Sequence, residues 1–122
     1  MYVGFDSIKL NARKQIEING IVDEMPTTIV LFGKSPSKIK FLEKDEEWFN
    51  EEIRLARLEY RDAFEELEVL TMERLKFASN FLENANLLKE VTDRMRTAAT
   101  KIAHNELILL AMNNRAETEV EA

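Results

Sequence analysis

Cysteine is absent from the 122 residues, so the chain forms no disulfide and offers no thiol nucleophile. There is also no Gly-x-x-x-x-Gly-Lys phosphate loop and no Gly-x-Gly-x-x-Gly dinucleotide pattern. The single histidine, His104, follows Lys101 by three residues, which breaks the Glu-x-x-His pattern of di-iron bundles. We therefore expect no enzyme activity, no metal and no cofactor, with His104 on a helix surface or in an interface.

Long apolar runs are missing as well, so the sequence predicts no bilayer-spanning segment. The first ten residues contain Asp6 and Lys9 and lack the apolar stretch of a secretory signal, which favours a cytoplasmic protein. The net charge of −6 disfavours duplex nucleic acid as the main partner, because that binding depends on neutralising phosphates. Residues 43–122 hold most of the negative charge, with eleven Lys/Arg against nineteen Asp/Glu.

Glycine and proline do not occur after Pro36, so helix-breaking residues stop where long periodic segments begin. The pattern predicts one α+β domain over residues 1–122. A small N-terminal antiparallel sheet of about four strands fills residues 1–42. Two long C-terminal helices, or one long kinked helix, occupy residues 43–113, and residues 114–122 form a polar, frayed tail.

Period-two alternation carries the strand prediction, and the expected arrangement is a four-stranded meander. The predicted strands cover residues 8–10, 16–18, 28–32 and 38–42. Asn19-Gly20 predicts a two-residue hairpin turn, and the apolar stretch 28–32 is expected to be the most covered strand. Residues 11–18 fit either a strand or a helical turn.

The first helix is predicted over residues 45–83, with Asp45 as its N-cap. Apolar side chains recur every three or four residues along it, interrupted only by Arg74. The members are Phe49, Ile53, Ala56, Tyr60, Ala63, Leu67, Leu70, Arg74, Phe77 and Phe81. A helix of about 58 Å exceeds a compact domain of this size. We therefore expect a second copy, or the chain's own second helix together with a second copy, to cover the seam, giving a homodimer or a higher homo-oligomer.

The second helical segment begins near Asn86 and carries a similar seam. Its members are Leu88, Val91, Met95, Ala98, Ile102, Asn105, Leu109 and Met112. Helix-forming residues thin out over residues 79–86, where asparagines compete with the helix for backbone hydrogen bonds. The sequence leaves open whether the helix breaks there or only bends.

Three arginines, Arg54, Arg57 and Arg61, follow one flank of the first helix beside the seam. Arg54 has Glu51 within helical reach and Arg61 has Glu65, whereas Arg57 has no acidic residue three or four positions away. The row fits salt bridges between chains. The alternative is phosphate recognition by guanidinium groups, which bind phosphate oxygens in pairs.

Polar interruptions of the two seams form a second group of candidates. Arg74 and Asn105 fit register-setting positions in a helix interface, because a buried polar group must be paired. Alternatively they face a pocket near the bend, where Phe77 or Phe81 stacks on a flat ring and Asn84 and Arg94 add hydrogen bonds. The candidate ligand-binding residues are Arg54, Arg57, Arg61, Phe77, Phe81, Asn84, Arg94 and Asn105.

The layout resembles that of a known family. A chain that begins Met-Tyr-Val-Gly-Phe-Asp-Ser, with a small antiparallel sheet, Glu-Glu-Trp-Phe at 46–49 and a long bent helical hairpin, resembles the phage anti-defence proteins of the Thoeris system, first type. The resemblance implies a sponge that binds cyclic ADP-ribose isomers without degrading them, in the host bacterial cytoplasm, and keeps the immune effector silent. Some relatives also hold cyclic oligonucleotides.

Two other functions fit the same residues. The chain could be a helical oligomerisation module or a phage assembly component, in which both seams and the arginine row serve helix pairing. The acidic helical region also fits a protein-binding inhibitor that mimics an acidic surface. The sponge requires phosphate-binding and ring-stacking groups and no catalyst, and the sequence contains such groups.

Overall fold

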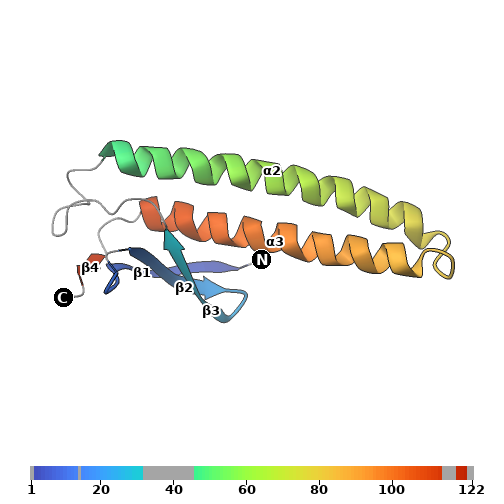
Figure 1. Ribbon diagram of the computed structural model, residues 1–122, viewed down its shortest axis with the longest axis horizontal. Coiled ribbons are helices and arrows are strands. Elements are labelled where there is room, and N and C mark those ends of the chain that lie inside the picture. The colour runs from blue at the N-terminus through green and yellow to red at the C-terminus, as the bar shows by residue number, and fades with distance from the viewer. Residues whose placement is uncertain (1, 14, 32–45, 114–117, 121–122) are drawn as a thin grey trace. The chain divides into compact units, whose positions relative to one another are not determined.

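The computed structural model describes residues 2–13, 15–31, 46–113 and 118–120. Three strands come first: β1 (Val3–Leu10), β2 (Ile16–Val22) and β3 (Met25–Leu31). Two helices follow, α2 (Glu46–Ala78) and α3 (Ala85–Asn113), before the short strand β4 (Thr118–Val120) (Figure 1). The α+β prediction is confirmed. The predicted strand 38–42 and the predicted N-cap Asp45 lie outside the described residues.

The chain divides into two compact units. Unit 1 comprises Met1–Arg57 together with Ala103–Ala122, and so contains the sheet, the start of α2 and the end of α3. Unit 2 comprises Leu58–Ile102, which is the remainder of both helices and the turn that joins them. Each unit has its own buried residues.

The sheet of unit 1 has the strand order β3-β2-β1-β4. β1, β2 and β3 are antiparallel neighbours, as the meander prediction requires. β4 comes from the C-terminal tail and runs parallel to β1, with Ile8 opposite Thr118. The four-stranded antiparallel N-terminal sheet is therefore not confirmed, and the prediction of a frayed tail is wrong for Thr118–Val120.

β2 occupies the interior of the sheet and alternates buried and half-buried residues. This result decides between the two options for residues 16–18 in favour of a strand. β3 lies at the edge of the described sheet, and its first two residues are exposed. The prediction that residues 28–32 form the most covered strand is wrong for the described part of that range, because Thr28 is exposed and Ile29 and Val30 are only half-buried, whereas β2 has buried residues at alternate positions.

The turn between β2 and β3 lies at Asp23-Glu24, and the prediction of a turn at Asn19-Gly20 is wrong. Asp23 and Glu24 have φ values of 48° and 68°, and they separate the paired residues Val22 and Met25. Positive φ at both central residues is the geometry that joins twisted antiparallel strands in two residues. Asp23 also accepts a hydrogen bond of 2.9 Å from the Tyr2 backbone N–H through Oδ1.

Gly20 lies inside β2, where a close approach of two segments requires a residue without a side chain. A Cβ at this position would collide with the Gly4 carbonyl oxygen and with a methyl group of Leu107. The Gly4 oxygen belongs to β1, whereas Leu107 belongs to α3. Glycine here therefore allows α3 to approach the sheet, and does not mark a turn.

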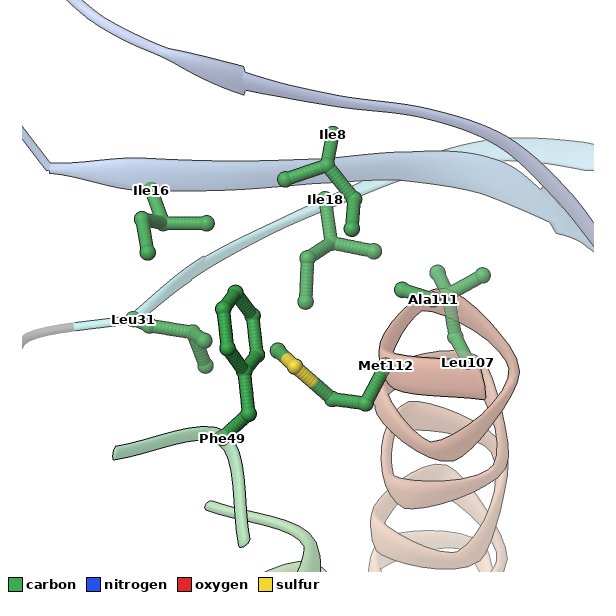
Figure 2. Close-up of a cluster of buried hydrophobic side chains, with 8 residues drawn as sticks. All are labelled: Ile8, Ile16, Ile18, Leu31, Phe49, Leu107, Ala111 and Met112. Carbon is green, nitrogen blue, oxygen red and sulfur yellow. The ribbon is translucent and has the colours of Figure 1, made fainter. Parts of the chain in front are cut away.

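The core of unit 1 lies between one face of the sheet and the two helix ends (Figure 2). Ile8 and Ile18 are opposite each other on β1 and β2, and both are fully buried. Phe49 extends from the start of α2 toward them, and Leu107, Ala111 and Met112 come from the end of α3. Ile16 and Leu31 complete the cluster. Residues from both ends of the chain thus share one apolar core.

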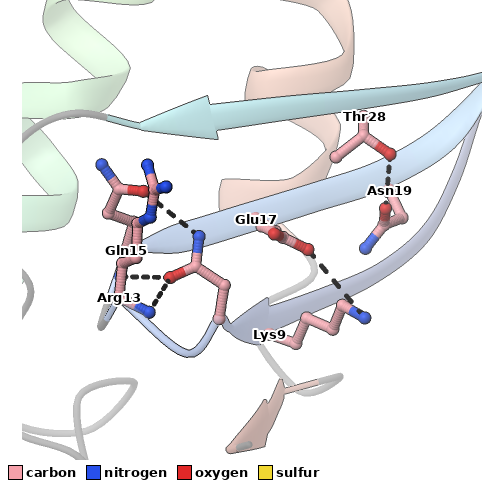
Figure 3. A network of polar contacts seen from close by, with 7 residues as sticks. Lys9, Arg13, Gln15, Glu17, Asn19 and Thr28 are labelled. Carbon is pink, nitrogen blue, oxygen red and sulfur yellow. Dashed lines mark hydrogen bonds and ion pairs between the residues drawn. The ribbon is translucent and has the colours of Figure 1, made fainter.

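The opposite face of the sheet is polar (Figure 3). Lys9 Nζ lies 3.9 Å from Glu17 Oε2, and Thr28 Oγ1 donates a 2.8 Å hydrogen bond to Asn19 Oδ1. In the β1–β2 connection, Asn11 Oδ1 accepts hydrogen bonds of 2.9 Å from the backbone N–H groups of Arg13 and Gln15. The sheet therefore has one apolar and one polar face, which is typical of antiparallel sheets.

Unit 2 is a helical hairpin, in which parts of α2 and α3 lie side by side (Figure 1). Residues 79–84 form the turn, so the helix is broken rather than bent. The predicted seams supply its buried residues: Ala63, Leu70, Leu88, Val91, Ala98 and Ile102. In unit 1, Phe49 and Ala56 of the same α2 seam are buried too. Within the hairpin the chain's own second helix therefore takes part in covering this seam, as one of the two expected alternatives has it, and the second copy stays a prediction.

Gly20→Ala is predicted to lower the free energy of unfolding by about 1–3 kcal/mol, because the added methyl group forces backbone or core atoms apart. Gly4→Ala is the matched control. Its Cβ would meet the Tyr2 hydroxyl at 3.1 Å, and that side chain is exposed and can move. Urea unfolding measures the free energy of unfolding of both variants. Equal losses of stability in Gly20→Ala and Gly4→Ala would contradict the close approach at Gly20.

Leu70→Ala is predicted to lower the free energy of unfolding by about 2–5 kcal/mol, since this side chain is 1% exposed within the hairpin. Leu82→Ala makes the same chemical change at a side chain that is 90% exposed, and we expect a change of at most about 0.5 kcal/mol. Thermal unfolding followed by circular dichroism compares them. A wild-type-like Leu70→Ala protein would show that the hairpin does not bury this seam by itself.

Candidate functional site

The candidate site is a groove of about 570 Å³ in unit 2. One wall comes from the last two turns of α2 and the turn, and the other from the first half of α3. Apolar side chains line much of it, namely Leu75, Ala78, Phe81, Ala85, Leu88 and Met95. The helical hairpin leaves this groove because the buried seam uses only one stripe of each helix.

Charged side chains of the groove are mainly cationic. Arg74, Lys89 and Arg96 line it, against a single carboxylate, Asp93. Arg96 Nη1 lies 3.8 Å from Asp93 Oδ1, so one cation is already offset. Among the described residues, no ion pair joins Arg74 or Lys89 to another side chain. The groove thus has an excess of positive charge on a chain whose net charge is −6.

Two threonines line the groove, but their hydroxyl protons are already used. Thr71 Oγ1 donates to the Leu67 carbonyl at 2.7 Å, and Thr92 Oγ1 donates to the Leu88 carbonyl at 2.8 Å. Both hydroxyls retain acceptor lone pairs, which suit a ligand's N–H or O–H groups. Donors toward an anion therefore come from Arg74, Lys89 and Arg96.

Only one of the eight predicted binding residues, Phe81, lines the groove. Its side chain is 64% exposed, which leaves a ring face open to a planar ligand. Phe77, four residues earlier, is half-buried and is not among the lining residues. Arg74, for which the sequence left open a register-setting position or a place in a pocket, is exposed and lines the groove.

Asn84 has a structural role in the turn. Its Nδ2 donates a 3.2 Å hydrogen bond to the Phe77 carbonyl near the end of α2, and its own carbonyl accepts from Leu88 N at 2.8 Å in the first turn of α3. Its side-chain amide thus supplies a donor to a carbonyl at the end of α2, and its backbone carbonyl accepts the first hydrogen bond of α3. The structure uses the amide for the turn rather than for a ligand.

Arg94 faces α2 rather than the groove. Its Nη2 lies 3.9 Å from Glu66 Oε1, and both side chains are about half exposed. An ion pair this open to water contributes roughly 0–1 kcal/mol. Arg94 therefore connects the two helices of the hairpin weakly, and is not among the groove residues.

The predicted arginine row is exposed throughout, and its members differ in their partners. Arg54 donates two hydrogen bonds to Glu51, of 2.9 and 2.6 Å, which lower the pKa of the Glu51 carboxyl. Arg61 lies 3.9 Å from Asp62, although Glu65 was the expected partner. Arg57 has no ion pair within the described part of the chain. Arg54 and Arg57 belong to unit 1, and Arg61 belongs to unit 2.

Asn105 is buried, at 3% exposed, as the seam prediction requires. It belongs to unit 1, whereas all lining residues of the groove belong to unit 2. His104 beside it is half-buried. The eight predicted residues are thus divided between the two units.

Lys89 and Arg96 were missed by sequence reasoning. They are seven residues apart on α3, so they share a helix face with Thr92 and Ala85 next to the buried seam. This spacing is visible in the sequence. Which residues of α2 lie opposite them depends on the length of the turn, and that length became clear only from the structure.

Among the residues placed by the structure, no three or more His, Asp or Glu side chains gather closely enough to hold a metal ion. Neither α2 nor α3, the two described helices, is sufficiently apolar over a long enough stretch to cross a bilayer.

Comparison with known proteins gives no relative: no protein-family model, no curated protein and no solved structure matches the chain.

Asn84→Ala is predicted to lower the free energy of unfolding by about 1 kcal/mol, because the Phe77 carbonyl loses its side-chain donor. Asn86→Ala is the control, since Asn86 is exposed in the first turn of α3. Thermal unfolding of both variants measures the difference. Equal stability of the two proteins would argue against a structural role for the Asn84 amide.

Proposed function

We propose that this chain sequesters a small phosphate-bearing ligand with a planar ring, and does so without transforming it. The observation that carries the proposal is the groove of unit 2, which is lined by three cationic side chains, by several apolar side chains and by an exposed phenylalanine. Arginine and lysine bind phosphate oxygens, and an aromatic face stacks on a base.

A cyclic ADP-ribose isomer is the first ligand to test. It combines a pyrophosphate, two riboses and a purine, so it needs cationic donors, hydroxyl partners and a ring platform together. Arg74 and Lys89 supply cations without an ion pair to any other described side chain, and Thr71 and Thr92 supply acceptor lone pairs for ribose hydroxyls. Phe81 supplies the ring.

The biological role that we propose follows from the resemblance of the sequence to Thoeris anti-defence proteins. A phage protein in the bacterial cytoplasm that binds the immune signal would keep the downstream effector inactive. Sequestration needs only affinity, and each tenfold gain corresponds to about 1.4 kcal/mol. Cyclic oligonucleotides present phosphates and bases in the same way, so they are a second ligand class for the same groove.

Calorimetric titration with cyclic ADP-ribose isomers tests this function. Arg74→Ala and Lys89→Ala should each weaken binding about 10- to 100-fold, as expected when a hydrogen bond between two charged groups is lost. Arg57→Ala is the matched control, because Arg57 is an exposed arginine of the same helix that does not line the groove. If Arg57→Ala greatly lowered the affinity for the ligand and Arg74→Ala did not, the binding site would instead lie on the row of Arg54, Arg57 and Arg61.

Recovery of the ligand separates a sponge from an enzyme. After incubation and denaturation of the protein, the cyclic ADP-ribose isomer should be released intact. A linear product would show hydrolysis, and would contradict sequestration. The proposed ligand class would be contradicted if these isomers and cyclic oligonucleotides gave no heat of binding and no shift of the unfolding temperature.

The second candidate is a helical oligomerisation or phage assembly module without a small-molecule ligand. The exposed apolar side chains of unit 2 favour it, since Val69, Met72 and Leu75 are all more than half exposed on α2. An apolar surface of this kind is typical of an interaction site. Under this function the groove variants would leave assembly unchanged, and no nucleotide would bind.

A further inference from the structure

The solvent-facing side of α2 in unit 2 carries an unusual set of apolar residues. Val69, Met72 and Leu75 are 57%, 68% and 66% exposed, and Leu58 adds to them about three turns before Val69. Because they are three residues apart, Val69, Met72 and Leu75 follow one another along a single side of the helix. We call Leu58, Val69, Met72 and Leu75 the outer stripe.

The charges along this helix are strongly asymmetric. The segment 58–68 carries five acidic residues and one arginine, whereas the segment 69–78 carries one acidic residue and two basic ones. Glu65 and Glu68 border the stripe on the acidic side of Met72, and Lys76 borders it on the basic side. All three side chains are exposed.

We infer that the outer stripe is a docking surface for a second copy of this chain, which binds antiparallel about a two-fold axis at Met72. Antiparallel pairing brings the basic half of each helix against the acidic half of its partner. Parallel pairing in register would instead bring the two acidic halves together, which like-charge repulsion disfavours. The charge pattern thus selects both the partner and its direction.

The helix repeat fixes which residues meet. With a rise of about 1.5 Å per residue and the axis at Met72, Lys76 of one copy lies at the level of Glu68 of the other, and Glu65 is within about one turn. Val69 lies at the level of Leu75 of the other copy, and Met72 meets itself. In a two-fold interface each contact between different residues occurs twice, so each such contact contributes twice to the stability of the dimer.

This surface adjoins the groove, because Leu75 belongs to both. A second copy on the stripe therefore lies along one edge of the groove and adds apolar surface there. The inference does not rest on the proposed ligand, since it follows from exposure and charge alone. Dimerisation and nucleotide binding are measured separately, so either can fail without the other.

A cross-linking experiment tests the position of the axis. The native chain has no cysteine, so Met72→Cys introduces a single thiol, and the axis brings it next to its equivalent in the other copy. Mild oxidation should give a disulfide-linked dimer in good yield. Glu59→Cys, an exposed position on the same helix more than three turns away, should stay largely uncross-linked under the same conditions.

A charge exchange tests the direction of pairing. Sedimentation equilibrium over a concentration series should show a mass rising from 14.2 kDa toward twice that value. Lys76→Glu and Glu68→Lys should each weaken the dimer about tenfold, and the double variant should recover most of the loss. Leu82→Ala, an exposed apolar residue outside the stripe, should leave the dimer unchanged, and circular dichroism checks that each variant folds.

Three outcomes would overturn the inference. The first is a protein that stays monomeric over the whole concentration series. The second is a dimer that forms equally well in Met72→Glu, which would place the interface elsewhere. The third is equal cross-linking of Met72→Cys and Glu59→Cys, which would show random collisions rather than a two-fold axis.

Discussion

The packing of both helix ends against one face of the sheet is the interaction on which unit 1 depends. A small sheet needs an apolar face that packs against other elements, and here Phe49, Leu107 and Met112 cover that face. Phe49 and Leu107 are separated by 58 positions in the sequence, so this core joins segments that are far apart along the chain. Gly20 allows the contact, because a side chain at this position would occupy the space of Leu107.

Unit 2 follows a different rule, since two helices alone bury only one stripe of each. Ala63 and Ala98 are small residues at buried positions, which permit close helix packing, and Leu70 and Val91 fill the remaining space. Every other apolar residue of the hairpin must then lie on a flank or in the groove. The exposed side chains of Met72, Leu75 and Phe81 are therefore a direct result of a two-helix architecture, and function in this unit has to be sought on those flanks.

The sequence predicted the seams well because a heptad pattern reports burial directly: Phe49, Ala56, Ala63 and Leu70 are seven residues apart and all are buried. It failed at Gly20 because a glycine required for close approach cannot be distinguished from a turn glycine without knowing that Leu107 lies against it. The candidate site was predicted only in part, with Phe81 in the groove and Asn84 in a structural role. Which residues of α2 lie opposite which residues of α3, such as Arg74 and Lys89, depends on where the turn begins and ends. No local sequence pattern determines the position of the turn.

Leu75 links the two proposals for unit 2, since it lines the groove and belongs to the outer stripe. If a second copy contacts Leu75, the free energy of ligand binding and that of dimerisation are coupled, and the coupling is reciprocal. Added apolar surface at the groove edge removes bound ligand from water and strengthens its contacts with Arg74 and Lys89. By the same linkage, a ligand that binds the dimer more tightly shifts the monomer–dimer equilibrium toward the dimer. An affinity that rises with protein concentration is therefore the property that would unite both proposals in one surface.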